Sequence, residues 1–321
     1  MKEFTIQSNE ANQRFDKYLK KILPNASTGF LYKMLRKKNI TCNKKKATGT
    51  EILKVGDVIQ LFFSDETFEK FSYNEETKRK EFELLKSYKR NDLKVIYEDN
   101  DVLNADKPYN MLSQKAETSD ISANEYLLGY LIRSGSLNFE TYQTFKPSVC
   151  NRLDRNTTGL LLMGKSLKGL QELSEALRER TVQKFYYAVV KGKVEEDAHL
   201  KGFLKKDEKT NKVIISEKEL PDSNWIETSF HVLKANSNVS LLEIHLITGK
   251  THQIRAHLSS IGHPIIGDMK YGDAKVNKYY YEKYKINHQM LHAKRLVFKN
   301  GQTYIANEPK EFSKVFDMGE V

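Results

Sequence analysis

The chain has 321 residues, of which 39% are hydrophobic, and this is enough for about two domains with a sizeable core. No apolar stretch of about 18 residues occurs, and the first residues lack the apolar block of a signal peptide, so neither a transmembrane helix nor secretion is expected. Two cysteines are too few for a disulfide framework, and we expect a cytoplasmic protein with reduced thiols. The formal net charge of +11 favours an anionic partner, most often nucleic acid.

Residues 1–61 concentrate the positive charge, with 11 Lys and 2 Arg against 5 Asp and Glu. Apolar residues recur with helical spacing in the first of two predicted helices, at Phe15, Leu19 and Ile22. Either Ser27 or Thr28 can cap the second helix, which carries cations on one side. Short strands joined by turns are predicted over 39–43 and 53–59.

This segment resembles an S4 RNA-binding domain. The matching features are the Arg14-x-Asp16-x-x-Leu19 opening, the cationic second helix and the closing Lys54-Val55-Gly56-Asp57. The family usually has an asparagine-glycine turn where this chain has Asn43-Lys44. The resemblance implies that helix cations track RNA phosphates, and the residues expected to do so are Arg14, Lys33, Arg36 and Lys37. The alternative is a solvated basic face, but the cations are grouped, which favours RNA binding.

Residues 62–92 mix both charge signs without a clean hydrophobic period, so we expect a linker or a partly helical excursion there. Helix and loops are expected over 113–148, and Ser166 should cap a further helix. The remaining apolar runs predict strands at 95–103 (a pair joined by a turn), 160–163, 184–192, 213–216, 228–233 and 241–247. Strands with only two or three helices between them predict an α+β sheet domain over 93–321.

The stretch from Asn151 to Leu162 places Asp154 between Arg152 and Arg155, just before an apolar run. Nearby cations favour the ionised form of a carboxylate. Loop and turn formers follow Asp154, so it should lie on a loop held by a rigid scaffold, where catalytic groups are often found. From these residues alone, an ordinary turn aspartate between two surface arginines is the favoured interpretation.

A second polar cluster, Thr248 to Leu258, follows a predicted strand and enters a helix. A phosphate-binding P-loop needs a glycine five residues before Gly249, where this chain has Ile244, so the motif is not matched. A zinc site could use His252, His257 and His263, but the spacing of five between His252 and His257 puts them on different helix faces, and no Cys or Glu completes a ligand set. The third interpretation is a helix start whose polar groups face an anion without a metal.

With Asp154 and this cluster together, the chain resembles the RluA/RluC/RluD family of RNA pseudouridine synthases. Four blocks match in order over roughly residues 93–305: Tyr97 to Pro108, Arg152 to Leu160, Lys184 to Tyr186, and Thr248 to Gly272. The resemblance implies a pseudouridine synthase fold, with a mixed and mainly antiparallel sheet, preceded by the small S4 α/β domain. This chain departs from the family at three positions, with Asn151 for histidine, Thr158 for serine and Lys250 for arginine.

The resemblance implies that a uridine within RNA is isomerised: the base leaves C1′, rotates and rejoins through C5. Asp154 would act as the catalytic nucleophile or stabilise the ribose cation, and Arg255 would pair with it and orient it. Tyr186 would stack on the flipped uracil and could help to remove the C5 proton, whereas Tyr187 should point to the opposite strand face. The residues expected to contact RNA near this site are Arg152, Arg155, Lys250, Thr251, His252 and Gln253. Lys107 could be structural only.

No cofactor and no metal are expected, because the reaction has no redox change and adds no group. The expected partner is structured RNA, in the first place large-subunit ribosomal RNA, because S4-bearing members of the family mostly act there. A monomer is the default. A non-catalytic RNA-binding or ribosome-assembly factor and a synthase acting on transfer RNA stay open as alternatives. An enzyme of nucleotide phosphates that uses Gly249-Lys250-Thr251 is a third, distant option.

Overall fold

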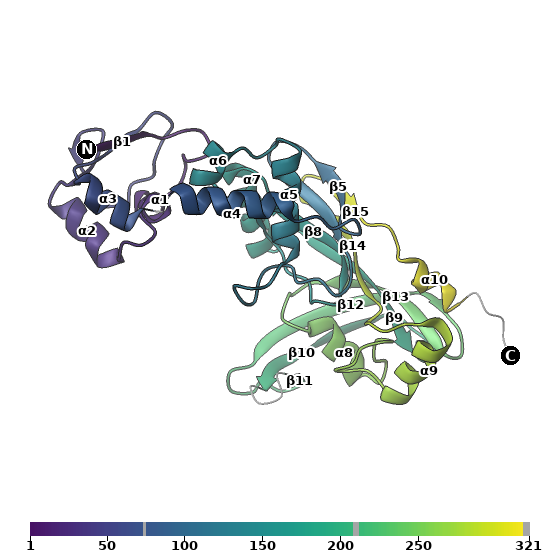
Figure 1. Ribbon diagram of the computed structural model, residues 1–321. Coiled ribbons are helices and arrows are strands. Elements are labelled where there is room, and N and C mark those ends of the chain that lie inside the picture. The colour runs from purple at the N-terminus through teal and green to yellow at the C-terminus, as the bar shows by residue number, and fades with distance from the viewer. Residues whose placement is uncertain (73–74, 208–211, 317–321) are drawn as a thin grey trace. The chain divides into compact units, whose positions relative to one another are not determined.

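The structure is a computed structural model that describes residues 1–72, 75–207 and 212–316 (Figure 1). The chain forms two compact units. The first comprises Met1–Lys89, Glu125–Ser148 and Gly164–Leu170, and the second comprises Arg90–Asn124, Val149–Met163 and Gln171–Val321. The domain boundaries expected at 61 and 92 stay a prediction. The segment between them contains the helices α3 (Asp65–Phe71) and α4 (Glu75–Ser87).

The first unit opens with a four-stranded antiparallel sheet in the order β1-β4-β2-β3. Its strands are β1 (Lys2–Thr5), β2 (Ile40–Cys42), β3 (Lys45–Lys46) and β4 (Val58–Leu61). Helices α1 (Phe15–Ile22) and α2 (Thr28–Arg36) bury their apolar sides in the core that this sheet shares. The predicted cap of the second helix is confirmed, because Ser27 Oγ accepts a hydrogen bond from Phe30 N over 3.2 Å.

The turn between β2 and β3 lacks the glycine that such a turn favours. Asn43 and Lys44 adopt φ angles of +51° and +61°, the left-handed pair that a two-residue hairpin requires. The Asn43 side chain supports the turn by bonding Asp57 Oδ1 and Val58 N, each over 2.8 Å. An asparagine clamp therefore holds a conformation that a lysine adopts at a cost.

Two further helices complete the first unit, α5 (Ala123–Arg133) and α6 (Phe139–Thr144). The ring of Phe82 on α4 meets Phe139 and Tyr142 of α6 edge-on, with centroids 5.5 and 5.4 Å apart. This aromatic cluster explains why residues 75–87 form a helix within the segment expected to be a linker or a partly helical excursion.

The second unit is built on an eleven-stranded sheet whose main order is β11-β10-β12-β13-β9-β14-β8-β6-β5. Most neighbouring strands are antiparallel, whereas β8 and β14 run parallel, which confirms the predicted α+β class. The strands are β5 (Lys94–Glu98), β6 (Val102–Lys107), β7 (Ser148–Val149), β8 (Thr158–Gly164), β9 (Gln183–Lys191), β10 (Ala198–Asp207), β11 (Lys212–Ser216), β12 (Asn224–Ala235), β13 (Val239–Leu246), β14 (Leu291–Val297) and β15 (Thr303–Ile305). The helices are α7 (Leu167–Arg178), α8 (Gln253–Ser260), α9 (Ala274–Tyr284) and α10 (Lys310–Lys314), and α8 packs against β11 and β12.

Strand β10 was not predicted. Its sequence alternates only loosely and contains Gly202, which weakens a strand pattern. The structure gives the glycine a reason: a Cβ there would lie 3.1 Å from the carbonyl oxygen of Ser216. The close approach of the Ser216 backbone therefore favours glycine at position 202, and this glycine weakens the strand pattern in the sequence.

Gly159 fixes where the Asp154 loop meets the sheet. Residues 158 and 159 pair in parallel with His292 and Ala293, and Gly159 adopts a φ of +106°. A Cβ at this position would lie 2.3 Å from the carbonyl oxygen of Ala293. Only glycine permits both the backbone angle and the approach, so the loop enters β8 in a single register.

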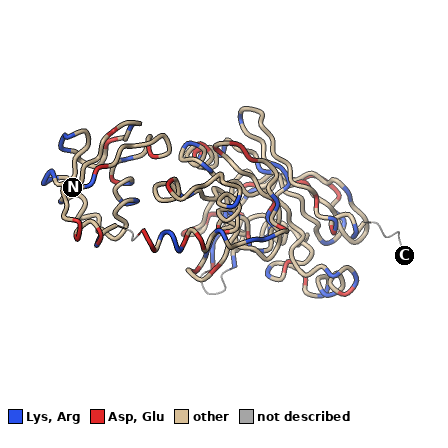
Figure 2. The backbone as a smooth tube through the Cα atoms, turned by 45° about the horizontal axis from the view of Figure 1, so that its top comes forward, with Lys and Arg blue, Asp and Glu red and all other residues tan. Residues whose placement is uncertain are grey.

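The positive charge is widely distributed. Figure 2 shows Lys and Arg in both units, interspersed with Asp and Glu. The net charge alone therefore does not locate an RNA surface. Among the residues that the structure describes, no helix is both long and apolar enough to cross a membrane.

Candidate active site

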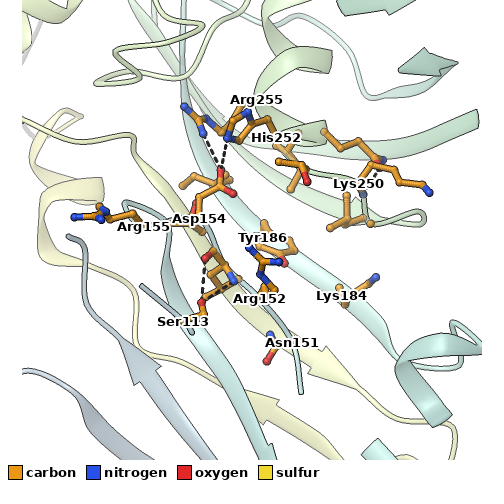
Figure 3. A pocket seen from close by; sticks show the side chains of 18 of the residues that line it. Ser113, Asn151, Arg152, Asp154, Arg155, Lys184, Tyr186, Lys250, His252 and Arg255 are labelled. Carbon is orange, nitrogen blue, oxygen red and sulfur yellow. Dashed lines mark hydrogen bonds and ion pairs between the residues drawn. The ribbon is translucent and has the colours of Figure 1, made fainter. Parts of the chain in front are cut away.

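A cavity of about 830 Å³ lies in the second unit, lined by the Asp154 loop, by β9 and by the loop between β13 and α8 (Figure 3). Asp154 is the single acidic residue among those that line it. Five lining residues are basic: Arg152, Arg155, Lys184, Lys250 and Arg255. A cavity with this charge balance favours an anionic ligand.

Polar side chains hold the Asp154 loop at both ends. Ser113 Oγ accepts from the backbone N–H of Leu153 over 2.9 Å and donates to its carbonyl over 3.0 Å. Asn151, which stands where the family has histidine, accepts from Leu162 N over 2.7 Å and donates to the Leu160 carbonyl over 3.1 Å. The side chain of Asn151 therefore extends the hydrogen bonding of β8 at the edge of the cavity that it lines.

Arg255 joins two carboxylates. Its Nη1 donates to Asp154 Oδ2 over 2.7 Å, while Nε and Nη2 donate to the two oxygens of Asp268 over 2.7 and 2.9 Å. Asp268 is fully buried, and one of its oxygens also accepts the backbone N–H groups of Lys270 and Tyr271. Burial raises the pKa of Asp268, but the hydrogen bonds from Arg255 and these amides outweigh burial and hold the pKa below its usual range.

The expected pairing of Asp154 with Arg255 is thus present in the structure. The Asp154 side chain remains 28% exposed, whereas the Arg255 side chain is only 8% exposed. Arg255 is therefore a buried group that Asp268 fixes, and it presents one N–H to a carboxylate that solvent and ligand can reach.

Lys107 lies beneath the catalytic loop and is fully buried. Its ammonium donates to the carbonyl oxygens of Pro108, Met111 and Arg155 over 3.0, 2.8 and 3.1 Å. Burial lowers the pKa of Lys107 to about 7, while the charge of Asp154 favours its charged form. These contacts agree with the expectation that Lys107 is structural, since it ties the loop to the end of β6.

Tyr186 lies on β9 and lines the cavity with 7% of its surface exposed. Burial, and then the charge of Asp154, raise the pKa of its phenol, so the side chain is a neutral ring with a protonated hydroxyl. Tyr187 is half-buried and lies 5.6 Å beneath the ammonium of Lys294, outside the cavity lining. The predicted difference between the two tyrosines follows from the alternation of side chains along a strand.

The loop that precedes α8 brings Lys250, Thr251 and His252 to the cavity. His252 adopts a φ of +56°, and its Nδ1 lies 3.0 Å from the Tyr271 hydroxyl. Its Nε2 is 3.9 Å from Asp154 Oδ2, and burial lowers the pKa of the imidazole. His252 is thus a neutral polar group beside the Asp154 carboxylate. Lys250 remains exposed, and its ammonium bonds Asn224 Oδ1 over 2.7 Å.

Gln253 has a different place from the one expected. Its side chain is 1% exposed, and its amide is used inside the protein. The oxygen accepts from Thr248 Oγ1 and Lys250 N, and the nitrogen donates to the Glu227 carbonyl and to Thr228 Oγ1. Gln253 therefore shapes the loop, and the direct RNA contact expected from the sequence stays a prediction.

Comparisons with known proteins identify the family. Residues 101–260 match the family model described as RNA pseudouridylate synthase. The chain is 32% identical over 306 residues to the ribosomal large subunit pseudouridine synthase C of Buchnera aphidicola, covering 93% of this chain and 89% of the relative. It is 31% identical over 304 residues to an uncharacterized RNA pseudouridine synthase of Mycoplasma genitalium, covering 94% and 90%. The chain belongs to the RluA/RluC/RluD family of RNA pseudouridine synthases. It is therefore an isomerase that acts on RNA.

A solved structure agrees on the fold. Human RNA pseudouridylate synthase domain containing 4 superposes with a TM-score of 0.56 at 21% identity, over 73% of this chain and 94% of that one. Human RNA pseudouridylate synthase domain containing 1 gives 0.55 at 22% identity, over 70% and 86%. The predicted pseudouridine synthase fold is thereby confirmed.

The RNA contacts predicted for this synthase fall into two groups. Arg152, Arg155, Lys250, Thr251 and His252 line the cavity, whereas Arg14, Lys33, Arg36 and Lys37 belong to the first unit. Lys33, Arg36 and Lys37 are exposed on or just after α2. Arg14 is committed to Asp16, with its Nε and Nη2 donating over 3.1 and 2.7 Å. Its charge is already compensated, which makes it the weakest candidate for RNA among these four.

Two elements of the site were missed or left unassigned at the level of sequence. Asp268 had a signal, because Gly267-Asp268 falls within a matched block, but its spacing does not reveal that it grips Arg255. Ser113 had none, since a lone serine in a loop is unremarkable. Within the described ranges, no three His, Cys, Asp or Glu residues gather as a metal site.

Proposed function

We propose that this synthase converts uridines of large-subunit ribosomal RNA to pseudouridine, with Asp154 as the nucleophile on a uridine flipped into the cavity. The ion pair between Asp154 and the buried Arg255 carries the proposal, because it orients a reachable carboxylate inside a basic cavity. Tyr186 offers a buried ring face for the extruded base.

The choice of ribosomal RNA is supported by the relatives. The ribosomal large subunit pseudouridine synthases C of Buchnera aphidicola and of Vibrio cholerae are 32% and 30% identical to this chain, and the chain covers 89% and 87% of their lengths. The small sheet of the first unit, which resembles an S4 domain, supports the same choice by supplying a second surface for structured RNA.

In this reaction the protein mainly has to position the Asp154 carboxylate and the uracil base. An ionised carboxylate can attack C1′ or stabilise the cation that forms when the uracil leaves. The cavity keeps the detached base beside Tyr186 until it rotates and bonds through C5. Arg255 maintains the orientation of Asp154 during these steps, since Asp268 holds its guanidinium in place.

Pseudouridine mapping tests the proposal. Total RNA is mapped from cells that lack the protein and from the same cells complemented with wild type, Asp154→Asn or Asp222→Asn. Asp222 lies on an exposed turn with a φ of +61°, which asparagine tolerates, so it is a matched control. We expect ribosomal sites to lose the mark and to regain it with wild type and Asp222→Asn only.

Other outcomes are equally decisive. Loss of the mark from transfer RNA alone would overturn the choice of ribosomal RNA and leave the role of Asp154 intact. Full restoration by Asp154→Asn would remove Asp154 as the nucleophile.

A further inference from the structure

Lys184 is a cation of the cavity that the proposed chemistry does not use. It lies on β9 two residues before Tyr186, so both side chains project from the same face of the strand. A Cβ on Gly249 would lie 3.3 Å from the Lys184 ammonium, which places that ammonium against the loop between β13 and α8. Figure 3 shows Lys184 and Lys250 on the same side of the cavity, away from Arg155.

The Lys184 ammonium has no anionic partner. Among the residues that the structure describes, none forms a hydrogen bond or an ion pair with it, whereas Lys250 bonds Asn224 and Arg255 bonds two carboxylates. Burial lowers the pKa of Lys184, and the neighbouring Arg180 lowers it further. A half-buried cation beside another cation is unfavourable unless an anion joins them.

Arg180 is itself an unexpected residue for its position. It follows α7 with a φ of +57°, and the N–H groups of Arg180 and Thr181 bond the carbonyls of Leu177 and Ala176 over 3.3 and 3.0 Å. This is the helix ending that usually carries glycine, because a Cβ is disfavoured there. An exposed arginine at this place retains a charge near Lys184 at the expense of backbone stability.

We infer that Lys184 binds a phosphate of the RNA backbone next to the nucleotide that enters the cavity. A phosphodiester supplies the anion that this ammonium lacks. Side chains two residues apart on a strand are separated by roughly 6.6 Å, so a phosphate at Lys184 flanks a base stacked on Tyr186. The inference rests on the proposed entry of the target uridine beside Tyr186, and it adds a contact that positions the neighbouring backbone.

The dependence of RNA affinity on salt tests this contact. The dissociation constant is measured over a series of KCl concentrations for wild type, Lys184→Gln, Lys184→Arg and Arg180→Gly. The probes are in vitro transcribed large-subunit ribosomal RNA and transfer RNA, and the slopes are compared on whichever RNA the wild type modifies. Lys299→Gln is the control, because Lys299 is exposed at the turn between β14 and β15 and does not line this cavity.

We expect Lys184→Gln to weaken binding about tenfold and to reduce the slope of the logarithm of affinity against that of salt by about 0.7–0.9, the loss of one phosphate contact. Lys184→Arg should keep the slope, as should the control. Arg180→Gly should raise the melting temperature, because glycine suits the helix ending.

A structural role for Lys184 predicts the opposite pattern. Overlapping slopes of wild type and Lys184→Gln would overturn the inference, and so would a Lys184→Gln variant that melts earlier and loses affinity equally at every salt concentration. Neither result would touch the proposed function, which Asp154→Asn and the choice of modified RNA decide separately.

Discussion

Asp268 grips Arg255 through two parallel hydrogen bonds, from Nε over 2.7 Å and from Nη2 over 2.9 Å. The guanidinium is therefore fixed on one side by a buried carboxylate before it meets Asp154 on the other. Such a fork defines both the position and the plane of an arginine. The orientation of the Asp154 carboxylate thus depends on a residue that does not line the cavity.

Replacing Asp268 with asparagine should impair catalysis through Arg255. The substitution keeps the shape but removes the buried charge that balances the guanidinium, so we expect a loss of about 10–100-fold in kcat and a stability loss of a few kcal/mol. Single-turnover kinetics and urea unfolding measure the two effects. Combining Asp268→Asn with Arg255→Gln should cost much less than the sum of the single losses, because the pair acts as a unit. Fully additive effects would disprove the coupling.

Tyr186 should act as a neutral phenol whose hydroxyl keeps its proton. Its phenol pKa is raised by burial and then by Asp154, so the wild-type rate should show no inflection from tyrosine ionisation up to about pH 10. Tyr186→Phe should keep the affinity for RNA, whereas Tyr186→Ala should lose about 1–3 kcal/mol of binding free energy with the stacking surface. A rate that rises with ionisation of Tyr186 near neutral pH would contradict this account.

Buried histidines should destabilise the protein in acid. Burial lowers the pKa of His257 to about 4 and that of His292 to about 3, from an ordinary value of 6.5. Below about pH 6.5, these two histidines therefore bind protons in the unfolded chain but stay neutral in the folded chain. Stability should be complete above that pH and fall as the pH drops towards 4, by on the order of 3 kcal/mol for His257 alone.

Urea unfolding at a series of pH values measures this loss. His257→Gln should flatten the dependence, because it removes the buried imidazole. An unaltered acid slope in His257→Gln would refute the assignment.

Lys107→Met should loosen the catalytic loop. Methionine fills the volume of the buried stem but leaves three carbonyl oxygens without their donor, so we expect a loss of about 2–4 kcal/mol in unfolding free energy. Hydrogen exchange should rise in residues 108–111 and 152–157 before it rises elsewhere. A variant as stable as the wild type, with unchanged exchange, would show that these bonds contribute little.

Much of the fold follows from patterns that the sequence displays openly. The apolar run of β8 and the alternation of β9 and β13 are read directly, since their side chains face one core. Strand β10 is not predicted from the sequence, because Gly202 permits a close backbone approach that arises only in the folded sheet. The helical segment at 75–87 is likewise secured by aromatic partners on α6, more than 50 residues away in the chain.

In the site, too, some features can be predicted from the sequence and others depend on the folded structure. Asp154 and Arg255 are 101 residues apart, and their pairing was foreseen only through the family resemblance, because no local pattern links them. The burial of Gln253 could not be foreseen, since glutamine side chains are mostly exposed. Spacing along the chain identifies which residues can meet, whereas three-dimensional packing decides which polar atoms remain for RNA.

The arrangement of one arginine between two carboxylates also bears on electroneutrality during turnover. If Asp154 forms a bond to C1′, its carboxylate becomes a neutral ester. A simple pair would then leave Arg255 as an uncompensated cation, which is costly because its side chain is buried. Here Asp268 remains opposite the guanidinium, so the interior stays balanced while the ester exists. The second carboxylate therefore allows the first to change its charge without disturbing the scaffold that orients it.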